Sequence, residues 1–482
     1  MPLAPRVRFA PSPTGYFHVG SARTSLFNWL VARQTGGTFV LRIEDTDAER
    51  GRQEWLDGII SAMEWLGLSA DEGPFRQSEA ESRHRLLADA LYDAGYLYAC
   101  SCSRDEIDAR TKGNATPGYD GHCRDAAVSR TESTALRFRT PVDGETIVDD
   151  VIRGRVSFPH SAMEDFVTVK STGAPLFALA NAIDDRDMAI SHIIRGEDLL
   201  PTTPKQVLLW QALDAVDVVV PTPVFAHLPM LVNEQRKKLS KRRDPVAVES
   251  YRDQGYLPDA FVNYLALLGW SPAGDVEICD RSTLIEQFAL ADVHHAPAFF
   301  DVAKLTHING EYIRAMDVED FIAAAQPWIT PELASWSPEG AAPAWPAERF
   351  DPAVFAAMAP LVQERVATLG EIPAMVDFLF LADPPLDAAA VAKVLVGDTN
   401  AEHILTTALE IYGTCDFEAT ALHQATVAVG ETLELNLRKT QAPIRVAVTG
   451  RSVGPPLFES LAALGRDEVL RRVEAALELA RG

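Results

Sequence analysis

In the first part of the chain, the pattern of hydrophobic and polar residues changes from one typical of a strand to one typical of a helix. Residues 6–10 form a short apolar run typical of a strand, and residues 18–34 follow with apolar positions at helical spacing. These positions are Leu26, Phe27, Leu30 and Val31. Gly36 and Gly37 are expected to end the helix, and residues 38–45 have the pattern of a second strand. A strand, a helix and a strand in this order predict a βαβ unit and a parallel sheet.

The pattern changes further along the chain. Residues 50–98 predict helices around a loop at 69–78, and residues 99–187 carry short strand-like runs among turn-rich segments. A strand, a loop and a helix return from residue 188, and Asp198, Thr202 and Thr203 are the candidate caps of that helix.

The last part of the chain, from residue 246, has helical periodicity, with a linker candidate at 335–352. We therefore expect one α/β domain in two halves, residues 1–98 and 188–245. An α+β insertion at 99–187 separates the halves, and a helical part follows.

Composition places the chain among ordinary globular proteins. It has 482 residues, of which 47% are hydrophobic and 23% are charged, enough for several domains. No window approaches a membrane-spanning helix, and the N-terminus has no targeting pattern. Five cysteines without an even framework favour a reducing compartment, so we expect a cytoplasmic protein.

The net charge of −24 argues against a nucleic-acid partner, but residues 236–243 form a local basic run. Such a run is most often a solvated face. A basic patch on an acidic body can nevertheless bind phosphate groups.

The segment PSPTGYFHVGS, residues 11–21, joins the first strand to the first helix. Ligands of parallel sheets bind beyond the carboxyl ends of the strands, and a helix N-terminus attracts anions. His18 adds a donor there, and Gly20 leaves room for a flat ring. The segment indicates a nucleotide site, with the phosphates near His18 and the base near Gly20. Glu44 and Asp45 are expected on the same rim, and the alternative is a capped helix with an exposed histidine. Neither this segment nor the basic run has the pattern of a phosphate-binding or dinucleotide loop.

Four motifs together resemble the bacterial glutamyl-tRNA synthetases, which are class I aminoacyl-tRNA synthetases. They are RFAPSPTG at 8–15, LRIEDTD at 41–47, IIRGEDLLPTTPKQ at 193–206 and KKLSKR at 237–242. The first, with the histidine and glycine that follow, is similar to the HIGH-type signature of the class, and the last is similar to its KMSKS-type signature. The likeness covers nearly the whole chain.

The resemblance implies the fold and the reaction. It implies a Rossmann-type parallel-sheet catalytic domain with the α+β insertion binding the acceptor end, then all-α domains for stem contact (246–320) and anticodon binding (321–482). Glutamate would be activated with ATP and Mg²⁺ to glutamyl-adenylate and transferred to the 3′ end of tRNA-Glu. Whether tRNA-Gln is also charged stays open. The resemblance also implies a monomer without membrane contact.

The resemblance assigns ATP to the two signatures. His18 and Gly20 would hold ATP, and Lys238 and Lys241 would neutralise charge on the phosphates during catalysis. The other positions implied for ATP are Pro11, Ser21, Leu239, Ser240 and Arg242.

The resemblance assigns glutamate to a second set. Arg8 and Arg195 would face the side-chain carboxylate, and Glu44 would receive the α-amino group. Ala10, Ser12 and Asn181 match other pocket positions. Phe177 stands where the family usually has tyrosine, so a hydroxyl is missing. We expect weaker glutamate binding or a compensating water there.

Three cysteines suggest a structural metal. Cys100, Cys102 and Cys123 resemble the zinc ligands of some family members, with Asp125 where those have histidine. His122 and Tyr119 are other candidates for the fourth ligand, and three unmetallated thiols are the alternative. Cys279 and Cys415 are isolated and are expected to be packed thiols.

Two surfaces are expected to contact tRNA. They are the insertion, at about 100–185, and the helical C-terminal third, where Arg438, Lys439 and Arg445 are candidates. The alternatives are a glutaminyl-tRNA synthetase, a short paralogue without the C-terminal third, and a non-catalytic tRNA-binding relative. The helical tail, the length of the chain and the intact signatures argue against them.

Overall fold

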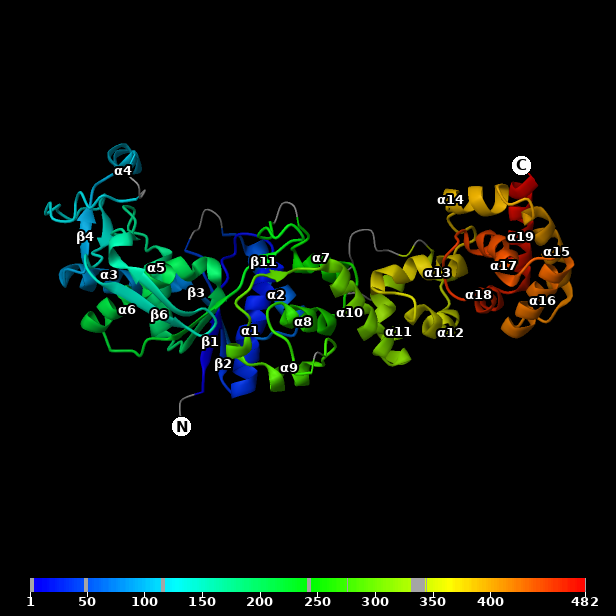
Figure 1. The fold of residues 1–482 in the computed structure, drawn as a ribbon, viewed down its shortest axis with the longest axis horizontal. Helices are drawn as coiled ribbons and strands as arrows, with labels where there is room; N and C mark the ends of the chain where they lie inside the picture. Colours follow the sequence, from blue (N-terminus) through cyan, green and yellow to red (C-terminus); the bar gives the residue numbers. More distant parts are fainter. Residues whose placement is uncertain are drawn as a thin grey trace. The chain divides into compact units, whose positions relative to one another are not determined.

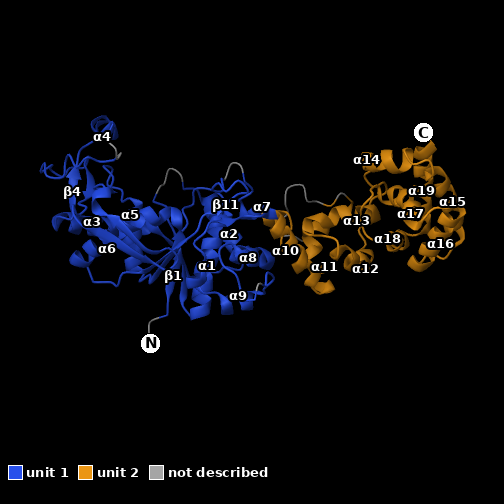
Figure 2. Cartoon of the chain, viewed as in Figure 1, with its two compact units in different colours: residues 1–250, 258–302 blue, residues 251–257, 303–482 orange. Residues whose placement is uncertain are grey.

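The computed structural model describes residues 4–46, 51–113, 118–240, 244–274, 276–330, 343 and 345–481. The chain forms two compact units (Figure 2). Unit 1 comprises Met1–Ser250 and Pro258–Val302, and unit 2 comprises Tyr251–Leu257 and Ala303–Gly482. The finer division into five parts stays a prediction.

A seven-stranded sheet forms the centre of unit 1 (Figure 1). Its order is β3 (Glu72–Arg76), β2 (Thr38–Ile43), β1 (Arg6–Phe9), β9 (His192–Gly196), β10 (Val224–Leu228), β6 (Glu145–Asp150) and β7 (Gly154–Pro159). Every neighbouring pair is parallel except β6 and β7. The prediction of a parallel sheet from the first strand–helix–strand unit is therefore confirmed.

Helix α1 (Val19–Thr35) connects β1 to β2 and ends where the sequence predicts. Gly36 adopts the left-handed conformation, with φ 65°, and its amide donates to the carbonyl of Ala32. Leu26, Phe27 and Leu30 are fully buried, which anchors the helix in unit 1. The start of α1 is thereby fixed beside the end of β1.

The predicted loop at 69–78 is wrong, because it contains β3. This strand lies at the sheet edge, where Pro74 is tolerated because an edge strand leaves one row of amides without a ladder partner. The predicted side-chain cap of α6 (Thr203–Val216) is also wrong. Thr202 occupies the cap position without a side-chain hydrogen bond, and a proline stands in the first turn instead.

The segment between the two halves of the sheet contributes to two sheets. Strands β4 (Leu97–Cys100), β5 (Ala135–Phe138) and β8 (Val167–Val169) form a separate antiparallel sheet, near α4 (Arg104–Thr111). Strands β6 and β7 join the main sheet beside β10. Helices α3 (Glu81–Asp93), α5 (Phe177–Asp187) and α6 share one apolar core with the smaller sheet.

Other helices of unit 1 pack on α1. They are α8 (Pro258–Leu267) and α9 (Arg281–Gln287). A further helix, α2 (Gln53–Trp65), follows β2 in the chain. The short strands β11 (Leu231–Val232) and β12 (Ala298–Phe299) pair in parallel.

The described residues of unit 2 form helices and turns without a strand, as the helical periodicity predicts. The larger helices are α10 (Val302–Ala315, whose first residue belongs to unit 1), α11 (Val318–Ile329), α12 (Pro352–Gln363), α13 (Ile372–Phe380), α15 (Ala401–Thr414), α16 (Ala419–Thr432), α17 (Leu437–Thr449), α18 (Leu457–Leu464) and α19 (Arg466–Arg481). They bury two apolar cores.

Most of the predicted linker at 335–352 lies outside the described residues, but its last part does not behave as a linker. Trp345 is buried, and its ring stacks on Phe350 with the centroids 6.4 Å apart. Among the described helices, none combines the length and apolar character needed to cross a membrane.

Candidate functional site

A cavity of about 590 Å³ opens at the carboxyl ends of β1, β2, β9 and β10. The segment after β1, the start of α1 and Glu44 after β2 all line it, as the sheet topology requires. It brings together most of the sequence-predicted residues: Arg8, Ala10, Pro11, Ser12, His18, Gly20, Ser21, Glu44, Phe177, Asn181, Arg195, Lys238 and Leu239. Ser240 is not among the lining residues, and Lys241 and Arg242 lie outside the described residues.

His18 occupies the N-cap position of α1 with an extended backbone. Its Nδ1 accepts the amide of Ser21 at 3.1 Å, and the Ser21 hydroxyl lies 3.0 Å from Nε2. A Cβ on Gly20 would lie 3.1 Å from the Nδ1 and Cε1 atoms of the His18 ring. Because a side chain at residue 20 would press on this ring, glycine preserves the position of the imidazole at the N-terminus of α1.

The basic segment begins as a tight turn after β11. Lys238 forms a bridge with Val232, and the amide of Leu239 donates to the carbonyl of Leu231 at 3.2 Å. Asp244 accepts the amide of Ser240 at 2.7 Å, which ties the two sides of residues 241–243 together.

The Lys238 ammonium group pairs with Asp198 at 3.1 Å, and both side chains are about half exposed. A half-exposed ion pair contributes little stability, so this lysine is free to exchange Asp198 for another anion at the cavity.

Arg195 lines the cavity from the end of β9 and is 4% exposed. It donates from Nε to His227 Nε2 at 3.2 Å and from Nη2 to the Thr203 hydroxyl at 2.8 Å. Its Nη1 is buried and has no hydrogen-bond partner within the described ranges. Burial, and then the nearby Arg8, lower the pKa of Arg195 to about 9. A buried cation with an unused donor at a cavity is arranged to receive an anion.

Arg8 also lines the cavity but already has a carboxylate partner. Its Nε lies 3.0 Å from Asp185 Oδ1, and Arg42 approaches the same oxygen at 2.7 Å. Burial opposes the charge of Asp185, yet the two guanidinium groups hold the pKa of this carboxyl below its usual value. The sequence did not single out Asp185, because an acid in a helix gives no signal of its distant partners.

Glu44 is the buried acid of the cavity. It accepts a hydrogen bond from the Asn181 amide, whose oxygen in turn accepts from Gln206 at 3.1 Å. Burial raises the pKa of Glu44, although Arg42 and Arg8 oppose the shift. A nearby cation stabilises the negative charge of a buried carboxylate, so Glu44 is suited to bind an ammonium group.

Phe177 is the first residue of α5 and lines the same cavity, half-buried. Its ring brings no polar atom to the cavity.

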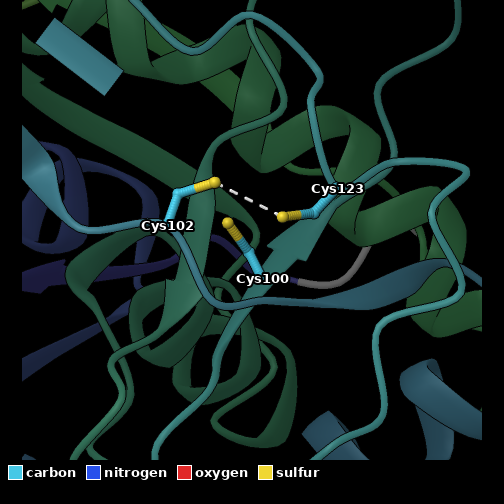
Figure 3. Close-up of side chains that lie close together, drawn as sticks. All are labelled: Cys100, Cys102 and Cys123. Atoms are coloured by element: carbon cyan, nitrogen blue, oxygen red, sulfur yellow. Dashed lines mark hydrogen bonds between the residues drawn. The ribbon is translucent and has the colours of Figure 1, made fainter. Parts of the chain in front are cut away.

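The sulfur atoms of Cys100, Cys102 and Cys123 lie within 4.8 Å of one another and converge on one point (Figure 3). The Cys102 and Cys123 sulfurs are 3.4 Å apart. Two guanidinium groups donate to the cluster, Arg110 to Cys102 and Arg137 to Cys100, each at 3.3 Å. Burial raises the pKa of Cys102 to about 11 despite the Arg110 donor, whereas hydrogen bonds outweigh burial at Cys123 and lower the pKa of that thiol to about 7. Zinc binds the thiolate form, so zinc binding would release the proton of Cys102.

The candidates for a fourth ligand differ in position. The Tyr119 hydroxyl lies 3.6 Å from the Cys100 sulfur and 2.7 Å from the Cys123 amide. The Asp125 side chain is 84% exposed and pairs with Arg139 at 2.9 Å, and His122 is exposed. The structure thus brings Tyr119, and not Asp125, to the cluster. Cys279 is a buried thiol and Cys415 a partly buried one, and neither belongs to the cluster.

The candidate anticodon residues also differ. Arg438 and Lys439 are exposed at the start of α17. Arg445 is partly buried and donates to the carbonyl of Pro455 at 2.7 Å, which is a structural contact within unit 2.

Comparison with known proteins supports one family. Residues 5–307 match the family model described as tRNA synthetases class I (E and Q), catalytic domain, and residues 320–477 match the anticodon binding domain. The chain is 54% identical to the glutamate–tRNA ligase of Frankia casuarinae, and 52% identical to that of Thermobifida fusca. The alignments cover 98% of this chain in both cases, and 98% and 97% of those proteins. A crystal structure of a glutamate tRNA ligase from Elizabethkingia meningosepticum in complex with its amino acid superimposes with a TM-score of 0.80. It is 30% identical, and the match covers 98% of this chain and 99% of that one.

Proposed function

The chain belongs to the glutamate–tRNA ligases of the class I aminoacyl-tRNA synthetases, and from this premise we propose how its residues carry out the reaction. An oxygen of the α-carboxylate of glutamate attacks the α-phosphorus of ATP, and the bond between this phosphorus and the oxygen that bridges to the β-phosphate breaks. Glutamyl-adenylate forms and pyrophosphate leaves. A ribose hydroxyl of the terminal tRNA nucleotide then attacks the glutamyl carbonyl carbon, its proton passes to a phosphate oxygen of the leaving AMP, and AMP leaves.

The ATP half of the cavity is built from the two signatures. His18 and the positive end of the α1 dipole face the phosphates, and Gly20 keeps the imidazole in place. Lys238 leaves Asp198 and neutralises charge that develops on the α- and β-phosphates. Lys241 and Arg242 are proposed for the same role. Mg²⁺ would accompany ATP and shield its phosphates.

The glutamate half is built from the buried charges. The single observation that carries the assignment is the unpartnered Nη1 of buried Arg195 at the cavity. The side-chain carboxylate of glutamate supplies the missing anion, with Arg8 beside it. Glu44, held by Asn181, receives the α-amino group, and Ala10 and Ser12 shape the pocket. The protein thereby acts by positioning the reactants and stabilising charge, with little proton chemistry of its own.

A zinc ion is proposed in the insertion. Three sulfurs within 4.8 Å suit tetrahedral zinc, and the Tyr119 oxygen is the nearest candidate for the fourth position. The ion would fix the segment between β4 and residue 123, a structural role away from the cavity residues.

The tRNA specificity, for tRNA-Glu alone or for both tRNA-Glu and tRNA-Gln, is the finer part of the proposed function. We expect tRNA-Glu to be bound through its acceptor end by the insertion and through its anticodon by unit 2, where Arg438 and Lys439 are exposed. The test is glutamylation of purified tRNA-Glu and tRNA-Gln side by side. Charging of tRNA-Glu alone identifies a discriminating enzyme, and charging of both identifies a non-discriminating one. If neither ATP–pyrophosphate exchange in the presence of tRNA nor charging occurs with glutamate, the assignment is overturned.

A further inference from the structure

The guanidinium group of Arg195 is held from one side by a residue that belongs to neither signature. His227, in the neighbouring strand β10, is fully buried, and its Nε2 lies 3.2 Å from Arg195 Nε and 2.9 Å from the Thr203 hydroxyl. Thr203 accepts from Arg195 Nη2 at 2.8 Å. The three side chains thus close a small hydrogen-bonded ring that leaves Nη1 for the ligand.

This geometry determines where the proton of His227 sits. Arginine has only donors, so Nε2 must offer a lone pair to Arg195 Nε, and the single proton of a neutral imidazole must be on Nδ1. Asp150 Oδ2 lies 2.6 Å from Nδ1 and accepts that proton in a hydrogen bond. A second proton on His227 would place two N–H groups against each other.

Asp150 is itself held as an acceptor. Its Oδ1 lies 2.8 Å from the Arg153 amide, 3.0 Å from the Ile152 amide and 3.2 Å from the amide of His227. Burial holds the pKa of His227 below its usual value. The positive charges of Arg195 and Arg153 also lower this pKa, whereas Asp150 raises it. The Phe225 ring stacks on His227 at 6.3 Å and adds no titrating group.

We propose that Asp150 and His227 are a positioning pair that fixes the Arg195 guanidinium in the orientation that selects a carboxylate over a carboxamide. The inference rests on the proposed function of Arg195 in binding the glutamate side chain. Between Arg195 and Arg8, glutamine offers one acceptor oxygen where glutamate offers two. Its NH₂ group would therefore face a guanidinium that can only donate, and this mismatch is costly only while the Arg195 guanidinium cannot turn away. The orientation therefore carries part of the specificity for glutamate.

The origin of Asp150 adds to the inference. It is the last residue of β6, a strand of the segment between the two halves of the sheet, and it pairs with Phe225 of β10. A residue of the insertion therefore supports Arg195 through His227 without itself lining the cavity.

Two matched variants separate positioning from packing. In His227→Gln, the Oε1 atom can take the place of Nε2 and accept from Arg195, without a tautomer to control. In His227→Asn, the shorter amide reaches Asp150 but not Arg195. We expect His227→Gln to keep the KM for glutamate within about three-fold of the wild-type value. We expect His227→Asn to raise it roughly ten-fold or more, as for the loss of a hydrogen bond to a charged group, with the KM for ATP unchanged. The ratio of kcat/KM for glutamate over glutamine should fall roughly ten-fold in His227→Asn only.

Asp150→Asn supplies the second test. Its amide can donate to Nδ1 and so favour the tautomer with Nε2–H, which cannot accept from Arg195. Asp150→Asn should therefore raise the KM for glutamate in the wild-type background and have no such effect in the His227→Gln background.

Three results would overturn the inference. They are equal KM values for the two His227 variants, an equal effect of Asp150→Asn in both backgrounds, or a loss of kcat and ATP affinity together with melting temperature. Charging of tRNA-Glu by the wild-type protein is measured first. Its absence would contradict the proposed function, whereas its presence with any of these results contradicts only the positioning pair.

Discussion

The amide of Val19, the first residue of α1, donates to the carbonyl of Val246 at 2.9 Å. Two residues on, the amide of Val248 donates to the carbonyl of Phe17 at the same distance, and His18 pairs with Ala247 between them. The chain that leaves the basic segment is therefore hydrogen-bonded to the segment that carries His18. The two signatures are more than 200 residues apart in the sequence, so this pairing is a long-range one.

This pairing gives the first prediction. Val248→Pro removes the amide that reaches Phe17, at the first position of α7 (Val248–Asp253), where the backbone angle of proline fits a helix. Val248→Ala keeps the amide and removes only side-chain volume. We expect the KM for ATP to rise roughly two- to ten-fold more in the proline variant than in the alanine variant, the value of one hydrogen bond. Equal ATP affinities in pyrophosphate exchange would show that the pairing does not position the ATP site.

Lys238 is predicted to act on the reaction and not on the fold. Its pair with Asp198 is half exposed and contributes about 1 kcal/mol at most. We expect Lys238→Ala to lower the rate of pyrophosphate exchange by roughly 100-fold, since it removes a cation from the developing phosphate charge, with little change in melting temperature. Asp198→Asn is the control, because it breaks the same ion pair and leaves the lysine. An equal loss of rate in both variants would assign the effect to the ion pair.

Phe177→Tyr is predicted to improve glutamate binding. The ring lines the cavity, and a hydroxyl there would add one hydrogen bond, worth ~0.5–1.5 kcal/mol net. The KM for glutamate should fall about two- to ten-fold, with the KM for ATP unchanged as the internal control. An unchanged or higher KM for glutamate in aminoacylation assays would show that the missing hydroxyl does not weaken the wild-type pocket.

The parts of the site that follow β1 and β2 could be predicted because they depend on local sequence. Helix α1, its stop at Gly36 and the loop with His18 are encoded within residues 6–45. The placement of Glu44 beside that loop follows from the parallel order of the strands. Motif spacing indicated the remaining ligand residues only through the family resemblance.

Long-range pairing explains what the sequence could not predict. Strand β3 contains Gly73 and Pro74, which indicate a turn, and it becomes a strand only through its pairing with β2. Asp185 and Asp150 show no local pattern that distinguishes them from surface acids. Their roles come from Arg8 and His227, which are 177 and 77 residues away in the chain.

The buried carboxyl of Glu44 predicts a pH dependence of glutamate binding. Because burial raises its pKa, this group takes up a proton at a higher pH than an ordinary glutamate does, and the neutral acid no longer attracts the α-ammonium group. The KM for glutamate should therefore rise as the pH falls from neutral toward about pH 5, with ATP held at saturation. Glu44→Gln should show a high KM at every pH, without the slope.

The sign for stability is opposite to that for binding. A carboxyl with a raised pKa in the folded state binds its proton more tightly there than in the unfolded chain. Its contribution to stability is therefore present at low pH and is lost as the pH rises through the raised pKa.

For binding, a wild-type KM for glutamate that stays constant from neutral pH to about pH 5 would contradict the assignment of Glu44 to the α-amino group.

The cysteine cluster predicts one zinc ion per chain, with Tyr119 as the expected fourth ligand. Tyr119 lies at the cluster while Asp125 pairs with Arg139, so Tyr119→Phe should lower the zinc affinity at least about ten-fold and Asp125→Asn should leave it unchanged. Zinc content is measured by mass spectrometry after dialysis against a competing chelator. Because zinc binds the folded state, its removal should also lower the melting temperature of the wild-type protein. Loss of zinc in Asp125→Asn alone would make Asp125 the ligand, and a wild-type protein that takes up no zinc would leave the cluster as three thiols.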